Sequence, residues 1–422
     1  MSSRPRPPRP RLLADLSPLR ESRDFRLLFA GGGVSHLGRQ LTVVAIPYQV
    51  FIITGSSLAV GMVGLVTVVP LVTLSLAGGA IADAVDRRKL LLVTQLLSAA
   101  TSAGLAVNAA SPSPRLWPIY VLAALSAGLA GVDHPARAAI IPRLVGRRLF
   151  PSAAALGQIQ FQVGHVVGPA LAGVIISRVS LAAAYWIDAA SFGAAVVAIA
   201  AIRPQPPEGG GTRASLASIV EGLRYLRGRR LLISTFLIDI NAMVFGMPRA
   251  LFPALGTTFF GGGAVTVGLL YAAPGAGALA GALLTGWVGG VRRQGRAVIV
   301  AVIVWGGAIA VFGLVPWLPL GLAMLALAGA ADVVSAVFRN TILQLSVPDS
   351  LRGRLSSVHI AVVTGGPQIG DAEAGAVAAV TSPRFSVVSG GVACVLGALV
   401  LARCVPELAR YDALAETRRV DG

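Results

Sequence analysis

Charged residues are scarce in this sequence: Asp, Glu, Lys and Arg make up only 13% of its 422 residues. Soluble domains carry about 25% charged residues, so this chain has too few to cover a water-facing surface. Hydrophobic residues make up 55% of it and fall in runs of about 20 or more, long enough for a helix to cross a hydrocarbon core. Such runs are too apolar for the strands of a transmembrane β-barrel. The sequence therefore predicts an all-α membrane protein.

Groups that mark an enzyme or a metalloprotein are also few. The four histidines and two cysteines show no metal-ligand spacing. Cys394 and Cys404 lie ten residues apart on one predicted helix, roughly 15 Å along its axis, which is too far for a disulfide. No Gly-x-x-x-x-Gly-Lys-Ser/Thr loop occurs, and no nucleophile–base–acid constellation is visible. We expect no metal, no cofactor, no ATP drive and no enzymatic activity.

The hydrophobic runs predict twelve transmembrane helices. They lie near residues 27–53, 57–82, 90–109, 117–137, 152–176, 181–202, 231–257, 265–289, 297–315, 318–338, 355–379 and 385–404. On the side that holds both termini lie 30 of the 35 basic residues. By the positive-inside rule, both termini are cytoplasmic. This rule also accounts for the net charge of +17, so we expect no nucleic-acid partner.

One long polar interval divides the chain into two halves. Residues 203–230 begin Pro- and Gly-rich and continue with apolar residues at helical spacing beside arginines, which is typical of an amphipathic helix on the cytoplasmic leaflet. The predicted domains are a cytosolic basic tail at 1–24, six-helix bundles at 25–202 and 231–405 joined by this linker, and a cytosolic tail at 406–422. The N-terminus has no apolar core, so we expect no cleaved signal peptide.

Three sequence features recur in both halves at nearly one offset. The pairs are 79–89 with 286–296, Arg137 with Arg339, and Gly168-Pro169 with Gly366-Pro367, at offsets of 207, 202 and 198 residues. Duplicated halves imply a substrate path along the interface between them, near the bilayer midplane.

The second predicted helix ends in Gly79-Ala-Ile-Ala-Asp83-Ala-Val-Asp86-Arg87-Arg88-Lys89. This segment resembles the loop motif of the major facilitator superfamily, although Ala84 and Asp86 stand where that family has Arg and Gly. Asp83 can approach the N-terminus of a neighbouring helix, and the arginines can pair with acids across the interface between the halves. We expect a cytoplasmic gate; the alternative is an ordinary positive-inside loop. The residues of the expected gate are Gly79, Asp83, Asp86, Arg87 and Arg88.

The fifth predicted helix carries glycines at four- and five-residue spacing around a proline. They are Gly164, Gly168, Pro169 and Gly173. Such a stripe predicts close helix packing with a bend. The pattern resembles the helix-five motif of exporters and antiporters of the same superfamily, so the resemblance implies export; plain helix packing is the alternative.

A finer resemblance extends from Phe25 to about Val405. It is carried by Met247-Pro-Arg249-Ala-Leu-Phe-Pro253, Gly268-Leu-Leu-Tyr271, Leu343-Gln344, Pro348-Asp-Ser-Leu-Arg352 and Gly370-Asp371. These segments resemble enterobactin (siderophore) exporters and related bacterial drug efflux transporters. The resemblance implies the twelve-helix major facilitator fold, a small organic cargo that leaves the cytoplasm, and coupling to protons.

Charged residues inside membrane helices are expensive and normally face a cavity or a partner. In the superfamily's layout, helices one, four, seven and ten line the cavity. We therefore expect a set of cavity and substrate residues and a set of proton-coupling residues. The expected cavity residues are Arg39, His36, Asp239, Arg249 and Gln344, and the expected coupling residues are Asp239, Asp371 and Glu373.

Arginines in the cavity would suit an anionic or catechol-rich cargo, since charge-assisted hydrogen bonds are strong in a dry site. Structural ion pairs are the alternative role for Arg39 and Arg249. A coupling carboxylate must change its protonation as its surroundings change, and Asp239 and Asp371 are the first candidates. We expect packing or capping roles for Asp188 and His165, and a local ion pair of Asp133 and His134 with Arg137. Many drug–proton antiporters keep an arginine in mid-helix four, and 117–132 has none.

Together these observations predict a secondary exporter in the bacterial inner membrane. It would bind a small molecule and protons, contact the lipid bilayer and act as a monomer. A siderophore or other secondary metabolite is the first cargo class, and a multidrug or macrolide-type range is the second. A proton-coupled importer and a non-transporting membrane sensor remain as alternatives.

Overall fold

The computed structural model describes residues 15–206, 221, 224–347 and 349–412. Within these residues the regular structure is entirely helical, and ten helices are long and apolar enough to cross a membrane. Of the linker, residues 207–220 and 222–223 lie outside the described residues, so the predicted amphipathic helix is described only at 221 and 224–230; residues 1–14 and 413–422 of the two tails also lie outside.

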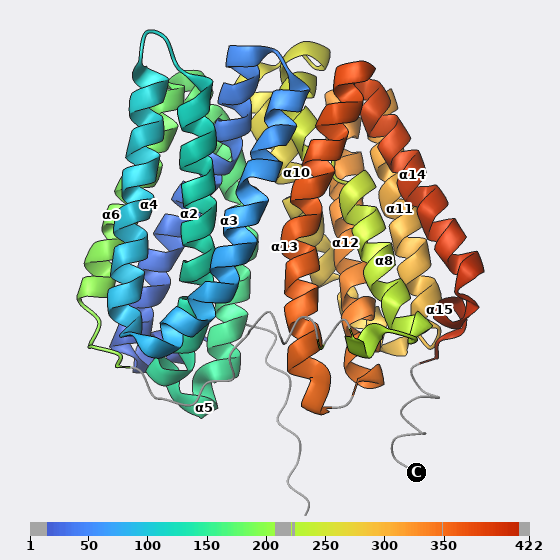
Figure 1. Ribbon diagram of the computed structural model, residues 1–422, viewed down its shortest axis with the longest axis horizontal. Helices are drawn as coiled ribbons and strands as arrows, with labels where there is room; N and C mark the ends of the chain where they lie inside the picture. The colour runs from blue at the N-terminus through green and yellow to red at the C-terminus, as the bar shows by residue number, and fades with distance from the viewer. Residues whose placement is uncertain (1–14, 207–220, 222–223, 348, 413–422) are drawn as a thin grey trace, which may run out of the picture.

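The helices form two groups that stand side by side (Figure 1). The N-terminal group, the N half, consists of α1 (Ser17–Glu21), α2 (Arg23–Thr54), α3 (Ser57–Ala84), α4 (Arg87–Ala110), α5 (Leu116–Arg178) and α6 (Leu181–Ala200). The C half consists of α8 (Arg230–Phe245), α10 (Gly263–Leu283), α11 (Gln294–Leu314), α12 (Leu318–Ser346), α13 (Asp349–Val380), α14 (Pro383–Cys404) and α15 (Pro406–Arg410). One large apolar core occupies the C half, while three smaller ones lie chiefly in the N half.

Helix α5 is 63 residues long, and it covers both the fourth and the fifth predicted helix. The chain leaves helical geometry at Gly146, where φ is 70° and ψ is 170°. Glycine suits this point because a side chain disfavours positive φ. The expected loop between 137 and 152 is therefore mostly helical, and a bend at one glycine replaces it.

The seventh predicted helix, 231–257, falls in one candidate membrane span, Arg230–Phe259, but the span is interrupted and is not a single regular helix. α8 ends at Phe245, and Arg249–Leu251 form a short 3-10 helix (η1) before α9 (Phe252–Ala254) and the π-helix η2 (Leu255–Phe259). Pro248 explains the break, because proline lacks an N–H and disfavours helical geometry in the residue before it. Trp305 Nε1 donates to the freed carbonyl of Gly246 over 2.8 Å. The eighth helix also ends early, at Leu283, and the 3-10 turn η3 (Thr285–Gly290) follows.

Figure 1 shows the bend of α5 and helix α15 at the same, lower end of the two halves. We call this the terminal end, and the opposite one the far end. The halves join through α3 with α13 and through α5 with α10. Glycines allow the helices to approach closely at these contacts. A Cβ atom built on Gly61 of α3 would lie 2.5 Å from the carbonyl oxygen of Asp371 in α13. A Cβ atom built on Gly268 of α10 would lie 2.5 Å from the carbonyl oxygen of Pro169 in α5. Both glycines lie toward the far end, so the halves pack tightly there.

Candidate functional site

A cavity of about 270 Å³ lies between the two halves. We call it the central cavity. Its N-half wall comes from α2, α3 and the first part of α5, and its C-half wall comes from η1, α10 and α13. Most of the lining is aliphatic. The charged side chains among its lining residues are Arg39, Arg249 and Asp371.

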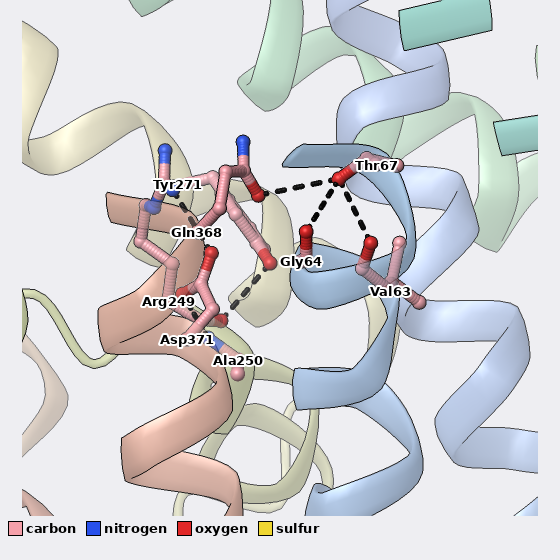
Figure 2. Close-up of polar contacts among 8 residues, drawn as sticks. All are labelled: Val63, Gly64, Thr67, Arg249, Ala250, Tyr271, Gln368 and Asp371. Atoms are coloured by element: carbon pink, nitrogen blue, oxygen red, sulfur yellow. Dashed lines mark hydrogen bonds and ion pairs between the residues drawn. The ribbon is translucent and has the colours of Figure 1, made fainter. Parts of the chain in front are cut away.

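Arg249 and Asp371 form an ion pair on the C-half wall. Arg249 Nη2 lies 2.9 Å from Asp371 Oδ2, and the backbone N–H of Ala250 donates to Asp371 Oδ1 over 3.0 Å (Figure 2). The break after α8 makes this arrangement possible, because the 3-10 turn exposes the N–H of Ala250 to the carboxylate. Arg249 keeps 30% of its side chain exposed and Asp371 keeps 13%, so the pair borders the cavity and is not sealed in the core.

Two further contacts tie this pair to its surroundings (Figure 2). The hydroxyl of Tyr271 in α10 donates to the carbonyl of Arg249 over 3.0 Å, which fixes the 3-10 turn. Thr67 in α3 donates to Gln368 Oε1 in α13 over 3.5 Å, one helical turn from Asp371. The second bond crosses between the halves, so the wall that holds Asp371 is also part of the closure at the far end.

Arg39 is the cation of the N-half wall. In the described part of the chain no carboxylate lies within ion-pair distance of it, and its guanidinium lies 5.5 Å from the ring centre of Phe192. The alternative of a structural ion pair therefore does not apply to Arg39 in this structure. Arg249, in contrast, is paired.

His36 lines a second cavity, of about 380 Å³, which Arg39 also lines. We call it the N-half cavity because all of its lining residues belong to α2 and α5. His165, from the helix-five motif, also lines it. The Gln40 side-chain nitrogen lies 3.3 Å from His165 Nδ1 and 3.5 Å from His36 Nε2, so the two histidines share one amide.

Asp239 lies away from both cavities. Its side chain is almost fully buried and forms an ion pair with Arg339 of α12, whose guanidinium also lies 3.9 Å from Asp332. A void of about 10 Å³ beside this pair is lined by Thr235, Phe236, Asp239, Arg339, Asn340, Leu343 and His359. A buried and paired carboxylate of this kind is a structural element unless the packing around it opens.

The remaining candidates have distinct positions. Glu373 and Gln344 line neither cavity, and Gln344 is exposed.

Asp133 forms the expected ion pair with Arg137, at 2.6 Å, and also accepts from Gln95. Among the described residues, no group of three or more His, Cys, Asp or Glu side chains could hold a metal ion.

Asp188 is almost fully buried. Its Oδ2 accepts from Thr42 over 2.6 Å and from Ser102 over 2.7 Å. It therefore joins three helices by hydrogen bonds, which matches the packing role expected for it.

The expected gate residues make contacts within the N half. Asp86 accepts from the N–H of Arg88 over 2.8 Å and caps α4. Arg87 donates to the carbonyl of Ala139 over 3.5 Å, and Arg88 Nε donates to that of Ile199 over 3.2 Å. The surroundings of Gly79 and the side chain of Asp83 lie outside the described part of the structure.

The helix-five glycines pack against two different helices. A Cβ on Gly164 would lie 2.3 Å from the ring of His36, and one on Gly168 would lie 2.3 Å from Cβ of Gln40, both in α2. One on Gly173 would lie 2.7 Å from the carbonyl of Ala264 in α10. The motif thus lets α5 contact a helix of its own half and a helix of the other half at once.

Sequence reasoning missed two features of the site. It did not pair Arg249 with Asp371, because 122 residues separate them and only the break after α8 brings them together. It also left out Tyr271, Gln368 and Thr67. Tyr271 and a polar Gln368 in an otherwise apolar helix could have been noticed, since polar groups in membrane helices normally have a partner.

The comparisons with known proteins agree with this geometry. A major facilitator family described as transmembrane secretion effector matches residues 13–420. Enterobactin exporter EntS of Citrobacter koseri is 30% identical over 399 residues, which is 94% of this chain and 96% of that protein. The EntS of Shigella boydii is 29% identical over the same shares.

Solved structures show the same fold at low identity. The nucleoside transporter NupG (D323A mutant) has a TM-score of 0.76 and 12% identity, covering 90% of this chain and 99% of its own. A bacterial homologue of the human lysosomal transporter Spinster has a TM-score of 0.67 and 14% identity, covering 93% and 96%. These relatives and structures are transporters and not enzymes. With a family match over nearly its whole length, the chain is a multi-pass protein of the bacterial inner membrane and belongs to the transmembrane secretion effector family of major facilitator transporters.

Proposed function

We propose that this protein exports a small organic molecule from the cytoplasm by alternating access and takes up protons in exchange. The observation that carries the proposal is the central cavity, where two features border the same space. One is Arg39, which has no ion-pair partner among the described residues, and the other is the Arg249–Asp371 pair of the C half. The EntS relatives are exporters by name, and the helix-five motif resembles that of exporters. Both support the outward direction.

The proposed topology has twelve membrane crossings with both termini in the cytoplasm. The ten apolar helices of the described residues support ten of these crossings. The other two would come from a second crossing by α5, which bends at Gly146, and from α13. The charge asymmetry of the loops supports the orientation. The terminal end is then cytoplasmic, and the glycine contacts at the far end close the outer side. The structure would thus be an inward-open state of a monomer.

The proposed cargo carries a catechol or a similar group, as a siderophore does. A catechol has adjacent oxygens that can donate and accept hydrogen bonds. One oxygen can accept from Arg39, while the neighbouring hydroxyl donates to Asp371. Charge-assisted hydrogen bonds of this kind are about twice as strong as neutral ones.

Asp371 is the proposed proton carrier. When it binds a proton, it can no longer accept two charge-assisted hydrogen bonds, and its attraction to Arg249 is lost. Cargo and proton then compete for one carboxyl group, which is the requirement for antiport. The sign follows directly: cargo affinity falls as the pH falls through the titration of Asp371.

The gate proposal concerns the terminal end. In this structure Arg87 and Arg88 bind carbonyls of their own half. On closure of the cytoplasmic side, they would exchange these carbonyls for acids across the interface between the halves.

The experiment is efflux from proteoliposomes with an imposed acid gradient and a panel of catechols and lipophilic drugs. The proposal expects gradient-driven movement of at least one catechol, with stoichiometric proton movement in the opposite direction. If nothing on the panel moves, or if movement does not respond to the gradient, the proposal is wrong.

A multidrug or macrolide-type range is the second candidate. The aliphatic lining of the central cavity favours it, including Val43, Ile46 and Val63. Competition separates the two candidates: a lipophilic drug that displaces the catechol and is itself pumped supports the broad range. Flux direction in inverted vesicles tests the importer alternative, and a protein that moves no compound would fit the sensor.

A further inference from the structure

The N-half cavity, of about 380 Å³, has a composition different from that of the central cavity. Its lining on α2 extends from Phe25, in the first turn, to Arg39 and Gln40, and Arg39 is 14 residues beyond Phe25. That span corresponds to about 21 Å of helix. Arg39 and Ala130 line both cavities. The two spaces therefore follow one another along α2 from the terminal end, with Arg39 at the junction.

One wall of the N-half cavity is aromatic. The rings of Phe161 and His36 are stacked, with centroids 5.4 Å apart at 23°, and the ring of His165 lies 4.2 Å from that of Phe161. Phe161 nevertheless keeps 47% of its surface exposed. A phenylalanine that lines the cavity beside two other rings and keeps this exposed surface offers a place for another planar ring to stack.

The charge of this cavity is positive. Its lining has two arginines, Arg39 and Arg137, and one carboxylate, Asp133. That carboxylate already accepts from Arg137 at 2.6 Å, Gln95 at 2.7 Å and Thr94 at 3.1 Å. A ligand that enters finds a cation at the inner end of the cavity without a bound counter-ion.

We propose that the N-half cavity is an entry subsite that binds one planar aromatic anion, such as an aryl carboxylate or phenolate group of the cargo. The ring stacks on Phe161, and the anionic oxygens face Arg39. Since Arg39 also borders the central cavity, the anionic group can stay bound to this side chain while the cargo moves from the N-half cavity into the central cavity. This inference rests on the proposed export function and assigns a second, earlier binding site within it.

The test measures binding at equilibrium without any gradient. The probe is salicylate, titrated into the purified full-length protein by calorimetry, and the comparison ligand is cyclohexanecarboxylate, which has the same charge and no planar ring. Stacking of aromatic rings corresponds to a gain of roughly three- to tenfold in affinity. We expect salicylate to bind more tightly than cyclohexanecarboxylate by about that factor.

The matched variants are Phe161→Leu and Phe150→Leu. Both residues are exposed phenylalanines of α5, and Phe150 does not line the cavity. Phe161→Leu should remove the preference for the planar acid, Phe161→Tyr should retain it, and Phe150→Leu should bind like the parent protein. Arg39→Gln should weaken both acids equally.

The outcomes separate this inference from the export proposal. If salicylate does not bind, binds no better than cyclohexanecarboxylate, or binds equally well to Phe161→Leu, the entry subsite is refuted even when gradient-driven efflux is present. If salicylate binds as expected and no compound is transported, the subsite stands and the export proposal fails.

Discussion

The two halves share one architecture but hold the arginines of the central cavity differently. Arg137 of the N half and Arg339 of the C half are both paired, with Asp133 and Asp239. The arginines of the central cavity differ: Arg39 has no carboxylate at ion-pair distance among the described residues, while Arg249 is paired with Asp371. A cation without an ion-pair partner can attract an anionic group of the cargo. In an arginine–carboxylate pair, the carboxylate can bind a proton, which weakens the pair. The difference suggests a division of labour: the N half binds the anionic group, and the C half senses protonation.

The largest effect is expected from Asp371→Asn, which removes the carboxyl that we propose binds the proton and takes the ion-pair partner from Arg249. Gradient-driven efflux in proteoliposomes should be lost, while cargo affinity should no longer vary with pH. Glu373→Gln is the matched control, because Glu373 lies two residues away in α13 and does not line the central cavity. Intact efflux in Asp371→Asn would refute the assignment of the coupling residue.

Arg339→Gln should act on stability and not on cargo binding. Breaking a buried ion pair by removing one partner costs about 3–5 kcal/mol, and Asp239 has only 1% of its surface exposed. Thermal unfolding in detergent should show a clear fall in Tm. The double variant Arg339→Met with Asp239→Leu should recover most of it, since the fully buried charge of Asp239 is then removed, while Asp332, 3.9 Å from Arg339, keeps 33% of its side chain exposed. A loss of cargo affinity at unchanged Tm would contradict this view of the C half.

Arg39→Gln should lower the cargo affinity and leave the thermal stability nearly unchanged, the opposite of Arg339→Gln. A hydrogen bond to a charged group contributes about 1.5–3 kcal/mol, so we expect cargo affinity to fall roughly 10- to 100-fold. Tm should change little because, within the described ranges, Arg39 forms no ion pair that the substitution would remove. Arg39→Lys should be intermediate, because lysine keeps the charge without the forked geometry. Titration calorimetry measures the affinity, and a variant with full affinity would remove Arg39 from the site.

The smallest effect is expected at the far-end contact. In Gly61→Ala the new Cβ would lie 2.5 Å from the carbonyl oxygen of Asp371, so α3 and α13 must separate. We expect a few-fold faster reaction of a Val60→Cys probe with an impermeant maleimide added from outside. Gly193→Ala is the control, since a Cβ there meets nothing within 4 Å. Equal rates in both variants would show that the glycine contact does not hold the outer side closed.

The sequence predicted the helical membrane fold from long apolar runs, because their length is set by the bilayer. It also predicted the local pair Asp133–Arg137, because residues four apart share a helix face. It could not predict the pairs Arg249–Asp371 and Arg339–Asp239, which lie 122 and 100 residues apart. Those pairs depend on how helices pack, and on a helix break that one proline introduced.

That proline also shows why Asp239 ranked too high among the expected cavity residues. A continuous helix would have placed Asp239 and Arg249 about 15 Å apart along one axis. The break at Pro248 turns Arg249 toward α13, and Asp239 stays within the C-half core. A charged residue in a predicted membrane helix indicates that a partner is present. It does not indicate whether that partner faces the cavity or the core of the helix bundle.

The most direct test of the account is the number of protons released when cargo binds to the purified protein. Calorimetry in buffers of different ionisation enthalpy, repeated across the pH range, measures it without a membrane gradient. We predict release of up to about one proton per cargo in the parent protein and in Glu373→Gln, and none in Asp371→Asn. Binding without proton release in the parent protein, or undiminished release in Asp371→Asn, would contradict the account.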